Sequence, residues 1–205
     1  TSEGKYFFQL RSDEAGGLNL LYLDYASQSA IVLCEKPNCL HNDETCTSFF
    51  PLKYGSASSC VVKNYLYLIF SGSKTENVPP TLFRLSLNGQ NRTEISTLPS
   101  EFSYSNPIAT DGEKLYTICN QLEINDEGIG HTFSNLISIA LENGAIETLR
   151  KWNSDAYLWG AENSEMFIMV PLNSEGSSLN FNVESINAAG ELKNRLSAML
   201  GQAGQ

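Results

Sequence analysis

The chain has 205 residues, of which 41% are apolar and 10% aromatic, enough to bury a core and to exclude an intrinsically disordered protein. Thirteen basic and 23 acidic residues give a net charge of −10, which repels a nucleic-acid backbone or an anionic lipid surface. The longest apolar run, Tyr65 to Phe70, is far shorter than the roughly 18 residues of a transmembrane helix. We therefore expect a folded protein that does not bind nucleic acid.

A repeating pattern of four units runs along the chain. Each unit opens with a polar turn and a short aromatic strand, and these openings recur roughly every 50–60 residues, a period typical of propeller blades. Each unit then continues with an alternating strand and a turn, and two of the turns are Asn-Gly, the pair preferred in tight hairpins because both residues accept positive φ. The aligned aromatic residues are Phe7, Tyr67, Tyr116 and Phe167.

The sequence therefore predicts an all-β, β-propeller-like fold of about four blades of antiparallel strands, as a single domain over 1–205 or a fragment of a larger propeller. An ordinary β-sandwich is the alternative interpretation of the same strands. The predicted units span about 1–33, 57–98, 105–150 and 155–200, and a Cys-rich insert occupies 34–56.

The insert between the first two units has the spacing C-x4-C-x-H-x4-C, from Cys34 to Cys46. Its Leu-Cys-x-x-Pro-x-Cys-x-His segment follows the strand Leu21-Tyr22-Leu23-Asp24, and in this it resembles a group of uncharacterised surface lipoproteins of Gram-positive gut bacteria. The resemblance implies a propeller-like, lipid-anchored protein at the cell surface and no established activity. The lipid anchor would lie upstream, because no lipid-attachment cysteine stands at the start of this chain.

Three interpretations of the insert stay open. In an oxidising compartment Cys34, Cys39 and Cys46 are candidates for disulfides that staple an irregular loop. The same three thiols with His41 could instead form a tetrahedral Cys3His zinc site, although the spacing matches none of the usual C-x2-C knuckles, or the thiols could stay free. No cofactor is required by the first interpretation, and zinc is the cofactor of the second. Five cysteines cannot all pair within one chain, which leaves Cys60 or Cys119 as a buried thiol.

Two further segments offer weaker candidates. The acidic loop from Glu123 to Gly130 lacks the alternating ligands of a calcium loop and is better explained as a solvated hairpin turn. The aromatic cluster of Trp152, Tyr157 and Trp159 could stack on sugar rings, but we expect it to pack between blades. Neither segment predicts a defined site.

The C-terminal segment from Glu191 to Leu200 places apolar residues at positions 192, 196, 199 and 200, with Gly201 as a stop. This spacing predicts a short helix. Such a helix would leave the last blade short of a strand. An open arc of blades would expose strand edges, and exposed edges favour a homodimer.

No constellation in the sequence predicts catalysis. Only His41 and His131 could act as a base for a nucleophile, no G-x-S-x-G elbow is present, and no carboxylate pair can be singled out. We therefore predict no catalytic residue. The expected function is a non-enzymatic, extracellular binding or scaffolding module of a bacterial cell-surface lipoprotein, with a protein, peptide or glycan as the unknown ligand. The alternative is an extracellular enzyme acting on carbohydrate or peptide through a site built from loops.

Overall fold

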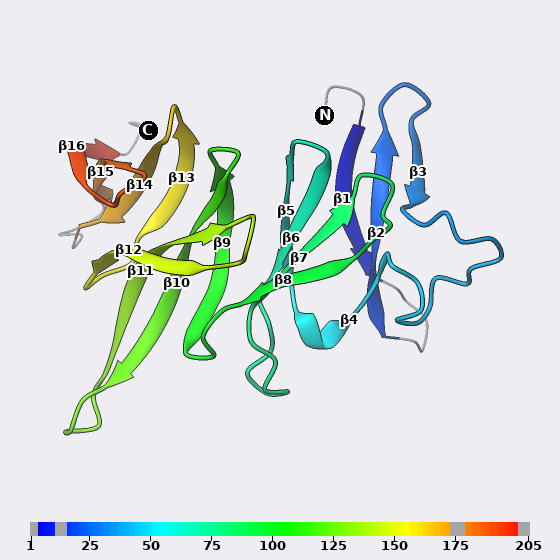
Figure 1. Ribbon diagram of the computed structural model, residues 1–205. Coiled ribbons are helices and arrows are strands. Elements are labelled where there is room, and N and C mark those ends of the chain that lie inside the picture. The colour runs from blue at the N-terminus through cyan, green and yellow to red at the C-terminus, as the bar shows by residue number, and fades with distance from the viewer. Residues whose placement is uncertain (1–3, 11–15, 173–178, 201–205) are drawn as a thin grey trace, which may run out of the picture. The chain divides into compact units, whose positions relative to one another are not determined.

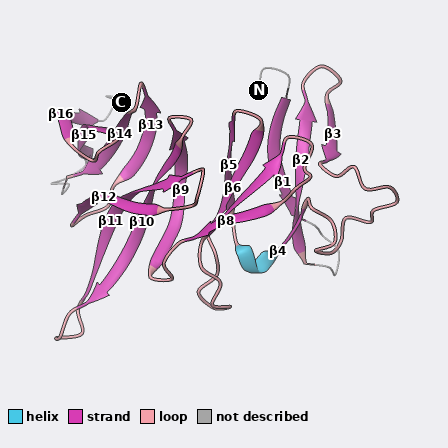
Figure 2. Ribbon diagram, viewed as in Figure 1, coloured by secondary structure: helices cyan, strands magenta, loops and turns pink. Residues whose placement is uncertain are grey.

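The computed structural model describes residues 4–10, 16–172 and 179–200, and these form strands joined by turns and one short 3-10 helix (Figure 2). The chain divides into two compact units, Thr1–Ser100 and Glu101–Gln205. Each unit contains two four-stranded antiparallel sheets. No helix within the described ranges is long and apolar enough to cross a membrane.

The first unit contains the first and second sheets. In the second sheet each strand pairs with the next along the chain, as in a propeller blade (Figure 1). In the first sheet β2 pairs with β1 on one edge and with both β3 and β4 on the other. The elements are β1 (Gly4–Leu10), β2 (Gly17–Asp24), β3 (Ser29–Val32), β4 (Phe49–Pro51), the 3-10 helix η1 (Leu52–Tyr54), β5 (Ala57–Val62), β6 (Tyr65–Phe70), β7 (Thr81–Ser86) and β8 (Thr93–Thr97).

The outer strand of the first sheet is interrupted by a long excursion of the chain. β3 pairs with Leu21–Asp24 of β2 and β4 pairs with Gly17–Asn19, so the two strands continue one another along the same edge. Between them Leu20 holds both ends of the excursion, because its N–H donates to Ser48 O at 2.8 Å and its carbonyl accepts from Leu33 N at 3.0 Å. We call the excursion, residues 33–48, the Cys loop.

The core of the first unit lies between its two sheets. Apolar side chains from the first sheet meet those of β6 and β7, and Phe50, Phe70 and Phe83 pack ring against ring with centroids 4.7–5.8 Å apart. Gly89, in the β7–β8 turn, has φ +80 and lies so close to Leu33 that a Cβ would sit 2.0 Å from the Leu33 carbonyl oxygen. Only glycine fits this approach between the two sheets.

The second unit contains the third and fourth sheets, each again ordered as the strands follow in the chain. A contact like that of Gly89 recurs, because a Cβ on Gly190 in the β15–β16 turn would lie 2.4 Å from the Leu149 carbonyl oxygen. The strands are β9 (Phe102–Thr110), β10 (Lys114–Ile124), β11 (Gly130–Ala140), β12 (Ile146–Trp152), β13 (Tyr157–Glu162), β14 (Glu165–Pro171), β15 (Leu179–Asn187) and β16 (Leu192–Leu200).

The core of the second unit contains a charged group. Glu184 on β15 is 2% exposed, yet it accepts a hydrogen bond from Trp152 Nε1 at 3.1 Å and two from the Arg195 guanidinium at 3.0 and 2.6 Å. Arg150 Nε lies 3.6 Å from Glu184 Oε2, the carboxylate oxygen that accepts the hydrogen bond from Trp152. These contacts link the third sheet to the fourth and compensate the buried negative charge. The apolar part of this core includes Tyr116, Ile118, Leu136, Leu158, Met166, Ile168, Val170 and Ile186.

The all-β, propeller-like prediction of four antiparallel units is confirmed. The first sheet also includes β4 at Phe49–Pro51, which lies within the predicted Cys-rich insert, 34–56. The prediction of a C-terminal helix is wrong. Residues 192–200 form β16, which pairs with β15 from Leu200 to Leu192, while Gly201 lies outside the described residues. Four apolar positions suggested a helical period, but the open edge of β15 offers backbone pairing along the whole segment, and tertiary context overrides so weak a periodicity. The prediction of a single domain over 1–205 concerns how the two units are joined, and it stays a prediction.

We expect Glu184→Gln to destabilise the second unit by about 1–3 kcal/mol, because the substitution removes the buried carboxylate charge that the partly exposed Arg150 and Arg195 compensate and weakens the hydrogen bonds it accepts. Both tryptophans lie in this unit, so their fluorescence during urea unfolding reports on it directly. Glu191→Gln, on an exposed carboxylate 3.6 Å from Lys193, is the matched control and should leave the midpoint unchanged. Equal midpoints for the two variants would contradict the assigned role of Glu184.

Candidate functional site

The Cys loop contains 16 residues without regular secondary structure and has almost no core of its own. Only Leu33, Cys46 and Ser48 are buried, and Leu40 at its tip is 76% exposed. Loops of this length without internal structure are uncommon in compact domains and are usually functional. Side-chain packing alone therefore does not explain the shape of the loop.

Polar contacts fix the loop to the rest of the first unit. The Arg92 guanidinium, at the start of β8, donates to the backbone carbonyls of Phe49 at 2.7 Å and Thr47 at 3.3 Å. Asn19 of β2 donates from Nδ2 to the His41 carbonyl at 3.0 Å. His41 has φ +56, a conformation that non-glycine residues rarely adopt. The backbone at this position is thus constrained by its surroundings.

The structure brings together all four predicted ligand residues of the loop. Their sulfur and nitrogen ligand atoms all lie within 4.8 Å of one another. A tetrahedral zinc site with Zn–S bonds of about 2.3 Å requires sulfur atoms about 3.8 Å apart, so the thiols are close to the separation that a bound metal would impose. The cluster could bind a metal ion such as zinc. We call this set the Cys3His cluster, and its members are Cys34, Cys39, His41 and Cys46.

Cys46 is the buried member of the cluster. Its sulfur lies 3.4 Å from His41 Nδ1 and 3.1 Å from Ser48 Oγ. Burial acts to raise the pKa of the Cys46 thiol, but the hydrogen bonds with Ser48 and His41 outweigh it and lower the pKa to about 6. Burial raises the pKa of the neighbouring Cys34 thiol to about 11. One thiolate is therefore favoured near neutral pH even without a metal, and thiolate is the form that binds zinc.

All five cysteines are free thiols in this structure. The predicted disulfides among Cys34, Cys39 and Cys46 are thus not formed here, but the three sulfurs lie close enough together that pairing stays an alternative to metal binding. Cys60 and Cys119 lie on strands β5 and β10, and burial raises the pKa of each thiol to about 12.

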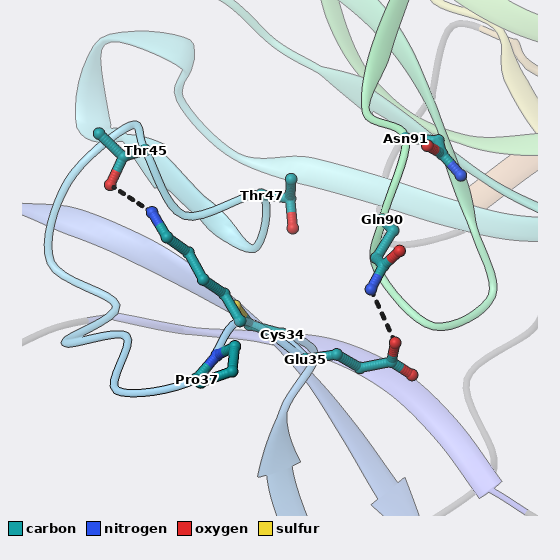
Figure 3. Close-up of a pocket in the computed structure, with 8 residues that line it drawn as sticks. Cys34, Glu35, Pro37, Thr45, Thr47, Gln90 and Asn91 are labelled. Carbon is teal, nitrogen blue, oxygen red and sulfur yellow. Dashed lines mark hydrogen bonds between the residues drawn. The ribbon is translucent and has the colours of Figure 1, made fainter.

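A surface pocket of about 390 Å³ adjoins the cluster, between the Cys loop and the β7–β8 turn (Figure 3). Figure 3 shows Gln90 of the turn reaching across to the loop, where its Nε2 donates to the Glu35 carboxylate at 2.7 Å. Cys34 of the cluster lines the same pocket. Sequence reasoning missed the pocket, because its two walls lie more than 40 positions apart in the chain.

The fourth sheet presents a second candidate surface. Its inner side chains, such as Leu158 and Ile168, pack on the third sheet, whereas the alternate positions point away from that core. Trp159 is 69% exposed and Tyr157 41%, so the prediction that these aromatics pack between blades is wrong for Trp159 and holds for Trp152, which is 8% exposed. A shift of register at Leu158 places Trp159 at a bulge. We call this the outer face, formed by Tyr157, Trp159, Phe167, Met169, Phe181 and Val183.

The acidic loop before His131 is the turn of the β10–β11 hairpin. Asn125 Oδ1 accepts hydrogen bonds from the backbone of Glu127 and Ile129, which closes the turn without an ion. Among the residues that the structure describes, the Cys3His cluster is the one group of at least three potential ligand residues close enough to hold a metal.

Comparison with known proteins identifies the fold. No protein-family model matches the chain, and no curated protein matches its sequence. The chain is similar in structure to oligogalacturonate lyase from Vibrio parahaemolyticus (TM-score 0.54, 13% identity, 95% of this chain and 48% of that one). It is also similar to TolB from Acinetobacter baumannii (TM-score 0.53, 8% identity, 98% and 41%) and to a prolyl endopeptidase (TM-score 0.50, 11% identity, 94% and 33%). The chain thus spans less than half the length of each of these propeller-type proteins.

We expect acrylamide to quench the emission of Trp159 much more strongly than that of Trp152, because only Trp159 is open to solvent. Trp159→Phe should remove the accessible, red-shifted part of the fluorescence and leave a blue-shifted, protected remainder. Similar quenching of the wild type and the variant would show that the outer face is covered in solution.

Proposed function

We propose that this chain is a non-enzymatic, extracellular binding or scaffolding module of a bacterial cell-surface lipoprotein, in which zinc bound by the Cys3His cluster fixes the Cys loop. One observation carries the proposal of a metal: three thiol sulfurs and an imidazole nitrogen converge within 4.8 Å on a loop with almost no core. Four protein ligands fill the tetrahedral coordination of zinc, which is the arrangement of structural rather than catalytic sites.

A bound zinc ion would stabilise the folded conformation of the loop, as a hydrophobic core does in other parts of the protein. The free energy of binding is about 10–16 kcal/mol in small structural zinc sites, and it becomes folding free energy when the site does not exist in the unfolded chain. Arg92 and Asn19 already anchor the loop at Thr47 and His41. Zinc would add a cross-link between the two halves of the loop, in addition to the backbone of Leu20 at their bases and the exposed 3.5 Å hydrogen bond from Lys36 Nζ to Thr45 Oγ1.

The metal proposal predicts one zinc ion per chain in protein purified without added metal, as measured by native mass spectrometry and elemental analysis. Cys39→Ser removes a partly exposed ligand and should abolish stoichiometric zinc without opening the core. Cys60→Ser, which changes a thiol outside the cluster, is the control and should keep one zinc. A metal-free protein whose mass is two hydrogens short would instead establish a disulfide.

The binding role is supported by the outer face of the fourth sheet. An exposed tryptophan beside an exposed tyrosine gives a large, stiff contact area, and such side chains dominate the affinity of many interfaces. The net charge of −10 disfavours anionic ligands. A protein, peptide or glycan that presents an apolar or cationic surface fits these conditions.

For any ligand found on glycan or peptide arrays, we expect Trp159→Ala to weaken binding at least about tenfold, the effect of losing an interface anchor. Tyr65→Ala is a matched control, because Tyr65 is as exposed as Tyr157 but its ring is covered by Arg84, with the guanidinium 4.9 Å from the ring centroid. Equal affinities of the two variants would show that the ligand binds at a surface other than the outer face. Measurable turnover of a carbohydrate or peptide substrate would contradict the non-enzymatic role.

A further inference from the structure

The members of the Cys3His cluster differ in their access to solvent. Cys34 and Cys39 are half-buried, and Cys34 lines the surface pocket between the loop and the β7–β8 turn. Cys46 is 1% exposed and lies against His41 and Ser48. A small oxidant entering the pocket therefore meets Cys34 first, and Cys39 is likewise more open to solvent than Cys46.

We propose that Cys34 and Cys39 form a reversible redox pair whose oxidation to a disulfide by a peroxide expels the zinc ion. The inference rests on the zinc site of the proposed function. It assigns to one cluster both of the chemistries that its residue types allow, zinc binding when the thiols are reduced and a disulfide staple when they are oxidised.

The reaction is a two-electron oxidation. One thiolate attacks the O–O bond of hydrogen peroxide and becomes a sulfenic acid, with release of one hydroxide. The second thiolate attacks that sulfur, forms the S–S bond and displaces the second hydroxide. Two sulfur atoms together lose two electrons, the peroxide gains them, and two protons from solvent convert the hydroxides to water.

Loss of two sulfur ligands leaves the metal with Cys46 and His41, too few to retain it. The loop keeps its contacts with Leu20 and Arg92 after oxidation. Cys34, next to Glu35, is then bonded to Cys39 and is no longer linked through zinc to Cys46. The pocket wall that contains Glu35 is therefore the part of the molecule that we expect to move.

The chain contains its own controls and a convenient means of mapping the bond. Cys60 and Cys119 lie outside the cluster, where no bound metal would hold them as thiolates, and burial raises the pKa of each thiol. Cleavage after glutamate divides the loop at Glu35 and Glu44, so that each cysteine of the cluster falls on a different peptide. A cross-linked pair of peptides then identifies the bond directly.

The test treats the zinc-loaded protein with hydrogen peroxide, follows released zinc with a chromogenic chelator and maps the cysteines by alkylation, cleavage after glutamate and mass spectrometry. We expect one zinc released per disulfide formed, a Cys34–Cys39 cross-link, and unmodified Cys60 and Cys119. Dithiothreitol followed by zinc should restore the starting mass. Cys60→Ser should behave like the wild type.

The outcomes separate this inference from the proposed function. A protein that binds no zinc in its reduced form overturns both. A protein that binds zinc and keeps it through peroxide treatment overturns only the switch. Release of zinc with irreversible sulfinic acid, or with a cross-link to Cys46, also overturns the switch and leaves the zinc site standing.

Discussion

The backbone of Leu20 is the constraint on which the candidate site depends. A strand edge offers a regular series of hydrogen-bonding groups, and along this edge of β2 the partner strand arrives in two pieces, β3 and β4. The N–H and carbonyl of Leu20 hold the ends of the break, so the 16 residues between them leave the sheet and return beside their starting point. The Cys loop is therefore an insertion into the strand position beside β2, and the pairing with β2 continues on both sides of the loop.

Such an insertion can vary its chemistry without disturbing the fold, but it cannot easily bury a core. The side chains of Arg92 and Asn19 donate to backbone carbonyls at two points of the loop, Thr47 and His41. Gly89 allows the second sheet to approach Leu33, the first residue of the loop, closely. A disulfide or a bound metal ion can hold the rest of the loop in one conformation without requiring the loop to bury apolar surface. The two chemistries differ in their conditions, since zinc requires thiolates and a disulfide requires an oxidant.

The sequence predicted the parts of the structure that follow from local patterns. Period-two alternation and turn residues located most of the strands in the four sheets, and the spacing of cysteine and histidine identified the four members of the cluster. It could not predict that β4 re-enters the first sheet, because three residues carry no period, or that Trp159 lies at a bulge pointing away from the core. The sequence predicted a helix in place of β16, because the segment becomes a strand through pairing with the edge of β15, which its own residues do not reveal.

The zinc-bound state of the Cys loop is the central claim, and X-ray absorption at the zinc edge of the protein as purified tests it most directly. The account predicts a zinc edge with three sulfur neighbours at about 2.3 Å and one nitrogen at about 2.0 Å. An edge that shows only oxygen and nitrogen neighbours, or no zinc in fully reduced protein, would contradict it.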